Sequence, residues 1–175
     1  IIDVAEYYGF SGERVMGLVF CSRRSEAETL SAMFNCIDKK NSGRKYRTVA
    51  LTGSDSEAAR RRAVEMLAAD SGEILDYIFT VDIFNEGVDI PEINQVIMLR
   101  PTESAIIFVQ QLGRGLRKAK GKEYVVVLDF IANYDNNYLI PIALSGDRTG
   151  NKDNIRRYLI EGNNVIKGAS TIYFD

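Results

Sequence analysis

Short, continuously apolar runs recur along the chain, and the segments between them carry apolar residues three or four positions apart. A short apolar run is typical of a strand that is covered on both faces of a sheet. The spacing of three or four is typical of an amphipathic helix. The pattern therefore predicts strands at residues 17–21, 48–51, 74–81, 95–99 and 124–130.

Segments with helical spacing fill the intervals between these strands. A first helix is expected within residues 1–10, Ser22 is expected to cap the second, and Asp55 or Ser56 the third. A fourth helix is expected after the fourth strand. Strands that alternate with helices pair in parallel through helical crossovers. We therefore expect an α/β fold with three layers, in which helices flank a mainly parallel central sheet.

The alternation ends near residue 133, and the following residues are rich in Asn, Gly and Asp. A short helix is expected at 153–160 and a strand-like end at 170–174. The first residue is an isoleucine within an amphipathic run, so the chain is expected to be part of a longer polypeptide. The predicted organisation is an N-terminal helix or linker at 1–14, a domain at 15–131, and a C-terminal extension or linker at 132–175.

Composition narrows the possible functions. A formal net charge of −2 argues against a free-standing nucleic-acid-binding protein, so any nucleic-acid contact must come from local patches. The absence of histidine excludes Ser-His-Asp and Cys-His catalysis and leaves no metal-ligand cluster. Cys21 and Cys36 are expected to be reduced core thiols of a cytoplasmic protein. No apolar run is long enough to span a membrane.

The most distinctive stretch is 110–117, with the sequence QQLGRGLR. Arg114 and Arg117 lie three residues apart, so one helical turn can present both on the same side. Two guanidinium groups placed in this way form a fork for phosphate oxygens. The alternative is an ordinary amphipathic helix with solvated arginines. The run Arg60–Arg62 is interpreted in this second way, as a solvated helix face.

Other candidate residues follow the predicted strands, because ligands of parallel sheets collect at the carboxyl ends of the strands. Small residues at these positions, Ser22, Thr52 and Gly53, can contact a phosphate backbone or simply cap helices. Arg23 and Arg24 beside a helix start weaken the helix unless an anion lies nearby, so they favour an anionic ligand.

Residues 85–91, NEGVDIP, form a further candidate segment. Gly87 lets the backbone approach a ligand, and the carboxylate of Asp89 can accept ribose hydroxyls or satisfy loop amides. The chain has neither a Gly-x-x-x-x-Gly-Lys-Ser/Thr phosphate loop nor a Gly-x-Gly-x-x-Gly turn. The arginines of 110–117 are therefore expected to act on a nucleotide held by another domain, as an arginine finger does.

Taken in order, these segments resemble the C-terminal, second RecA-like lobe of superfamily 2 helicases and translocases. Residues 18–23, LVFCSR, are similar to motif four of that family. Thr80 with 85–91 is similar to motif five, and 110–117 to motif six in its Gln form. The combination is closest to the DNA-directed branch that includes type III restriction subunits. One departure is an extra residue between Thr80 and Gly87 relative to the DEAD-box spacing.

The resemblance implies a RecA-like fold of the P-loop-NTPase type, without a phosphate loop of its own. Arg117 would be the arginine finger to the γ-phosphate of ATP, Arg114 a second phosphate or inter-lobe contact, and Gln110 a link between nucleotide state and nucleic acid. The ATP site would also be lined by Glu86, Gly87 and Asp89. The nucleic-acid backbone would be contacted by Ser22, Arg23, Thr52, Gly53 and Thr80.

The resemblance also implies partners and cofactors. ATP and Mg²⁺ would be bound mainly by an N-terminal helicase lobe that is absent from this chain. Residues 1–14 would connect that lobe to the domain at 15–131. The chain alone is therefore expected to be inactive and to supply no metal ligands. The substrate would be DNA, or RNA, held by its backbone. The alternative is a non-catalytic α/β module that binds nucleic acid or protein. A small-molecule transferase is disfavoured because the dinucleotide fingerprint is missing.

Overall fold

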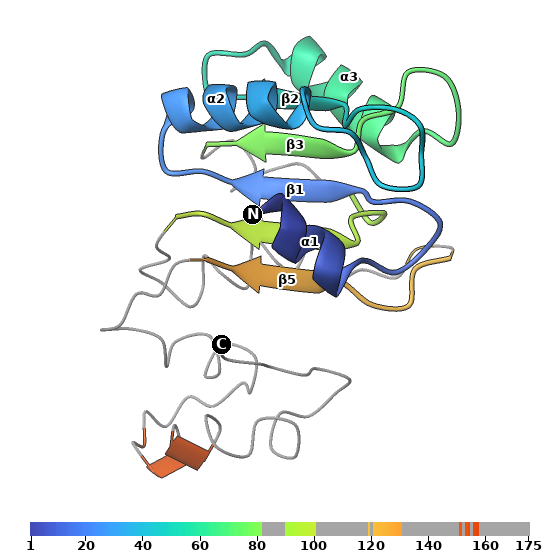
Figure 1. Ribbon diagram of the computed structural model, residues 1–175. Coiled ribbons are helices and arrows are strands. Elements are labelled where there is room, and N and C mark those ends of the chain that lie inside the picture. Colours follow the sequence, from blue (N-terminus) through green and yellow to red (C-terminus); the bar gives the residue numbers. More distant parts are fainter. Residues whose placement is uncertain are drawn as a thin grey trace. The chain divides into compact units, whose positions relative to one another are not determined.

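The computed structural model describes residues 1–81, 90–100, 119, 121–130, 151, 153–154 and 156–157 (Figure 1). Its contacts divide the chain into two compact units, Ile1–Pro101 with Gln111–Ile131, and Thr102–Gln110 with Ala132–Asp175. The first unit contains the following elements: α1 (Ile2–Tyr8), β1 (Gly17–Phe20), α2 (Arg24–Phe34), β2 (Thr48–Leu51), α3 (Glu57–Ala68), β3 (Tyr77–Thr80), β4 (Gln95–Met98) and β5 (Val126–Asp129).

The strands form one sheet in the order β2-β3-β1-β4-β5, and every neighbouring pair is parallel. The chain therefore moves outward from β1 to β2 and returns from β2 to β3. Right-handed crossovers then place α2 and α3 on opposite faces of the sheet. This arrangement confirms the predicted α/β fold with a parallel central sheet between helices.

The face under α1 and α2 carries one continuous apolar cluster, which includes Ala5 of α1 and Phe34 of α2. The Phe34 ring meets Phe79 of β3 edge to face, with the ring centroids 5.0 Å apart. The alternate side chains of the same strands are equally buried on the other face, among them Leu18 and Ile78. Both faces of the sheet are thus covered, which explains the continuously apolar strands of the sequence.

The helix caps differ in part from the prediction. Ser22 lies one residue before the N-cap of α2, which is Arg23 and makes no side-chain capping bond. Glu26, in the first turn of α2, reaches back instead and accepts the Ser22 N–H at 2.8 Å. Ser56 does cap α3, because its hydroxyl accepts the Ala59 N–H at 3.2 Å.

In the second unit, Asp153, Asn154, Arg156 and Arg157 are helical, within the predicted helix 153–160. The predicted strand at 170–174 lies outside the described residues, as does the helix expected after residue 101. Cys21 is buried, whereas Cys36 is exposed and is not a core thiol. Within the described part, no helix has both the length and the apolar character needed to cross a membrane.

Candidate functional site

The carboxyl edge of the sheet gathers the described candidate residues. Thr80 ends β3 and pairs in register with Phe20 of β1 and with Leu51 of β2. Thr52 follows β2 directly and Ser22 lies two residues after β1, so the three hydroxyl residues come from neighbouring strands. The predicted site residues on the nucleotide side lie outside the described residues, namely Glu86, Gly87, Asp89, Gln110, Arg114 and Arg117.

Ser22 and Arg23 form the exposed part of this edge. Among the described residues, the Ser22 hydroxyl makes a single long hydrogen bond, donated to the Leu99 carbonyl at 3.4 Å. Arg23 is exposed, and its guanidinium has no ion-pair partner within the described residues. Both residues line an open depression at this edge together with Leu99 and Phe130. Their side chains are thus available to an anionic ligand.

The Thr52 side chain is held inside the turn that follows β2. Its backbone N–H and its hydroxyl both donate to Asp55 Oδ2, at 2.7 and 3.0 Å. The hydrogen bond from the Thr52 N–H, together with that from the Thr52 hydroxyl, outweighs burial and lowers the pKa of the Asp55 carboxyl. Because the hydroxyl proton of Thr52 is already engaged, the exposed groups of this turn are those of Gly53 and Ser54.

Arg60 corrects the interpretation of Arg60–Arg62 as a uniformly solvated face. Arg61 and Arg62 do form exposed ion pairs, with Glu57 and Glu73. The guanidinium of Arg60 instead turns back along α3 and donates to the carbonyl of Gly53 at 2.8 Å. It therefore fastens the Gly53 turn to α3. No signal in the local sequence distinguishes this arginine from the solvated arginines beside it.

The sequence shows Arg24 as one of two basic residues at a helix start, and the structure adds a specific contact. In the structure its Nη1 donates to Ser54 Oγ at 3.1 Å, and its Nε is paired with Glu28 at 2.7 Å. The first residue of α2 thus reaches the turn that follows β2. This side chain therefore joins two of the segments that are predicted to contact the nucleic-acid backbone, the one after β1 and the one after β2.

Thr80 is completely buried, and its hydroxyl has no hydrogen-bond partner within the described structure. Buried polar groups are normally satisfied, so a lone hydroxyl at a ligand-bearing edge is notable. The described residues offer no cluster of three or more His, Cys, Asp and Glu side chains that could hold a metal ion.

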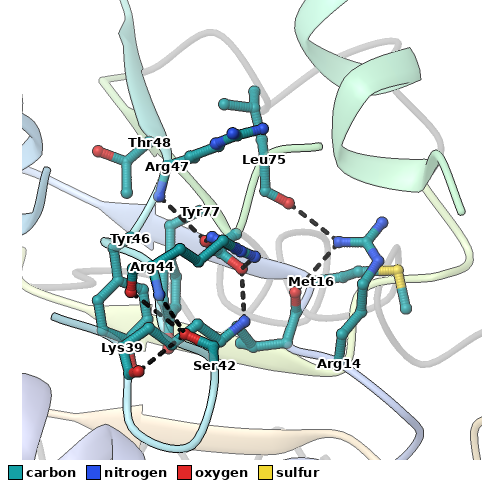
Figure 2. A network of polar contacts seen from close by, with 12 residues as sticks. Arg14, Met16, Lys39, Ser42, Arg44, Tyr46, Arg47, Thr48, Leu75 and Tyr77 are labelled. Atoms are coloured by element: carbon teal, nitrogen blue, oxygen red, sulfur yellow. Dashed lines mark hydrogen bonds and ion pairs between the residues drawn. The ribbon is translucent and has the colours of Figure 1, made fainter. Parts of the chain in front are cut away.

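The amino edge of the sheet carries a different polar network (Figure 2). Asp76 precedes β3, and its fully buried carboxylate accepts from Lys39 Nζ at 2.6 Å and from Arg44 Nη1 at 2.6 Å. Burial alone would raise the pKa of Asp76, but the hydrogen bonds from Arg44, Lys39 and the Arg47 N–H outweigh it and lower that pKa. Much of the basic loop 39–47 is therefore used to hold the fold together.

Comparison with known proteins adds independent information. Residues 4–119 match the model of the family described as "Helicase conserved C-terminal domain". The Saccharomyces cerevisiae protein IRC3 is 28% identical over 114 residues, which are 65% of this chain and 15% of that protein. The type I restriction enzyme EcoKI endonuclease subunit of Escherichia coli is 28% identical over 106 residues, which are 57% of this chain and 9% of that protein. The chain thus spans a small part of these relatives.

Solved structures show the same fold. The ATP-dependent type ISP restriction-modification enzyme LlaBIII bound to DNA superposes with a TM-score of 0.56 and 22% identity, over 72% of this chain and 9% of that one. The Escherichia coli DEAD-box protein SrmB bound to the regulator of ribonuclease activity A gives 0.55 and 16% identity, over 83% of this chain and 76% of that one. At these identities the likeness concerns the fold alone.

Proposed function

The chain belongs to the helicase conserved C-terminal domain family, and from this premise we propose that it is the second motor lobe of an ATP-dependent helicase or translocase. The observation that carries the proposal is the extent of the family match. Residues 4–119 include all three segments that resemble helicase motifs, from 18–23 through 85–91 to 110–117.

On the nucleotide side, we propose that Arg117 contacts the γ-phosphate of ATP as an arginine finger. Arg114 would make a second phosphate or inter-lobe contact, and Gln110 would couple nucleotide state to nucleic acid. The ribose side of the same nucleotide would meet Glu86, Gly87 and Asp89. ATP and Mg²⁺ would be held mainly by the first lobe, because this chain has no phosphate loop.

On the nucleic-acid side, we propose that the carboxyl edge grips the backbone of DNA, or of RNA. Ser22 and Arg23 present an exposed hydroxyl and an exposed guanidinium there. At the turn after β2, the contact would be made by the backbone of Gly53 rather than by the Thr52 hydroxyl, which donates to Asp55. Thr80 would contribute its buried hydroxyl, which has no partner among the described residues. Such contacts are independent of base sequence.

The decisive experiment is the Arg117→Ala substitution in the full-length protein, with nucleic-acid-stimulated ATP hydrolysis as the readout. Loss of an arginine finger should lower turnover by about a thousandfold or more. Arg114→Lys should also be costly, since lysine cannot form a bidentate fork. Arg61→Ala is the matched control, because Arg61 makes only an exposed pair with Glu57.

Near-normal turnover of the Arg117→Ala variant would refute the finger role. Absence of any nucleic-acid-stimulated hydrolysis in the unaltered full-length protein would favour the alternative, a non-catalytic module that docks nucleic acid or protein.

A further inference from the structure

Two adjacent amide side chains at the start of β4, Asn94 and Gln95, are both fully buried. Gln95 Nε2 donates to the carbonyl of Ala5 at 2.8 Å and to that of Gly9 at 2.7 Å. These two carbonyls lie at the C-terminal end of α1, where the Ala5 carbonyl also accepts the Gly9 N–H at 3.0 Å. The side chain of a strand residue therefore caps α1 from the sheet below it.

Gln95 is itself held in place across the sheet. Its Oε1 accepts the hydroxyl proton of Tyr77 at 2.6 Å. Tyr77 of β3 and Gln95 of β4 both pair in register with Gly17 of β1, which lies between them. A Cβ at Gly17 would lie 2.1 Å from Tyr77 Cδ1, so only glycine leaves room for the ring to lie over β1. The glycine is thus what allows tyrosine and glutamine to meet.

The Asn94 side chain likewise forms hydrogen bonds to the segment between α1 and β1. Its Nδ2 donates to the carbonyls of Ser11 and Arg14, at 2.7 Å each. Its Oδ1 accepts the Met16 N–H at 2.8 Å, and the Asn94 N–H donates to the Met16 carbonyl at 3.0 Å. Every polar atom of the Asn94 side chain is used on these residues.

The outer side of α1 has a second attachment. Glu6 accepts a hydrogen bond from the Tyr46 hydroxyl at 2.8 Å and pairs with Lys40 at 2.6 Å. Tyr46 and Lys40 lie in the loop that Asp76 fastens to the start of β3. The N-terminal segment is therefore tied to β4 by amides and to β3 through this loop.

We propose that Asn94 and Gln95 form an amide clamp that makes residues 1–16 a rigid part of this unit, a lever joined to β3 and β4. These two strands are followed in the chain by 82–89 and 101–118, the segments that hold the candidate nucleotide residues. Any movement of polypeptide preceding α1 would then pass to those strands through the clamp instead of being absorbed by a linker. Of the expected helix or linker at residues 1–14, this assignment favours a fixed helical attachment, and it does not depend on the proposed function.

The test is hydrogen exchange of the full-length protein, resolved to single amides. The amides of Gly9 and Met16 report on α1 and on the Asn94 contact, because they donate to Ala5 O and to Asn94 Oδ1. The exchange rates of both amides should lie within about tenfold of that of the Gly17 amide, at the start of the central strand β1. Exchange as fast as at the exposed turn residue Ser54 would overturn the proposal.

A pair of variants then isolates the clamp. Gln95→Leu removes one donor from the Gly9 carbonyl and one from the Ala5 carbonyl, which keeps the Gly9 N–H. This loss should raise exchange at Gly9 by about tenfold or more. Tyr77→Phe is the matched control, since it removes the phenol but leaves both N–H donors of Gln95, and Gly9 should change by less than about threefold. Unchanged exchange at Gly9 in Gln95→Leu would overturn the proposal. If that variant does not fold, the unaltered protein alone decides.

Discussion

The Asp76→Asn substitution tests the network at the amino edge of the sheet. The Asp76 carboxylate is fully buried and accepts from Lys39 Nζ, from both terminal nitrogens of Arg44, and from the Arg47 N–H, at distances of 2.6 to 3.0 Å. Asparagine keeps the shape of the side chain, but it removes the charge and turns an N–H₂ group toward two cations. The substitution therefore leaves both cations without their anion.

Breaking a buried ion pair by removing one partner costs about 3–5 kcal/mol. The Arg44 and Lys39 side chains are 32% and 14% exposed, so water can partly solvate the cations that lose their partner. We therefore expect the lower end, about 3 kcal/mol of unfolding free energy. For a chain of this length this corresponds to a decrease in Tm of roughly 6–12 °C.

Equilibrium urea unfolding followed by circular dichroism measures this cost. Asp38→Asn is the matched control, because Asp38 is exposed and its side chain makes no ion pair in the described part of the chain. The control should stay within about 0.5 kcal/mol of the unaltered protein. A cost below about 1 kcal/mol for Asp76→Asn would refute the reasoning, since it would show that the two cations do not depend on this carboxylate.

The same network makes a prediction about pH. Although burial alone would raise the pKa of Asp76, the hydrogen bonds from Arg44, Lys39 and the Arg47 N–H lower it in the folded protein. The stabilisation is then complete above the unfolded pKa of about 3.9 and is lost as the pH falls through the lower folded value. The difference in stability between the unaltered protein and Asp76→Asn should narrow below about pH 4. A difference that stays constant from pH 7 to pH 3 would contradict this assignment.

Two further substitutions test single contacts. Gly17→Ala should cost about 3 kcal/mol because its Cβ would lie 2.1 Å from the Tyr77 ring; a double-mutant cycle with Tyr77→Leu should recover part of this cost, and additive costs would argue against the clash. Thr80→Val removes a buried hydroxyl that has no described partner, so the Tm should be unchanged or higher. In the full-length protein the same variant should bind nucleic acid more weakly by fluorescence anisotropy, and unaltered binding would remove Thr80 from the proposed site.

The architecture was predictable because it follows from local patterns. Each crossover helix and each strand buries an apolar face whose period is visible in the sequence. The strand boundaries were less predictable: residues 74–81 were expected, whereas β3 is Tyr77–Thr80. Asp76, directly before it, is held by cations from another loop, and no local pattern contains that information.

The candidate site was predicted in part. The positions of Ser22, Thr52 and Thr80 at one edge followed from strand order along the chain. Their availability did not, because it depends on partners from neighbouring elements. Thr52 has the same residue type whether its hydroxyl is free or engaged by Asp55, and Arg60 gives the same pattern whether it is solvated or holds the Gly53 carbonyl.

The parallel α/β fold, the helicase family and the segments that hold its motifs can all be derived from the sequence, since periodicity and motif spacing are properties of neighbouring residues. The attachment of the N-terminal segment is visible only in the folded chain. Gln95 and Ala5 are 90 positions apart, and their hydrogen bond forms because the fold places α1 over the start of β4. A buried amide has a definite role once the fold has brought its partners to it, and a sequence read residue by residue does not contain those partners.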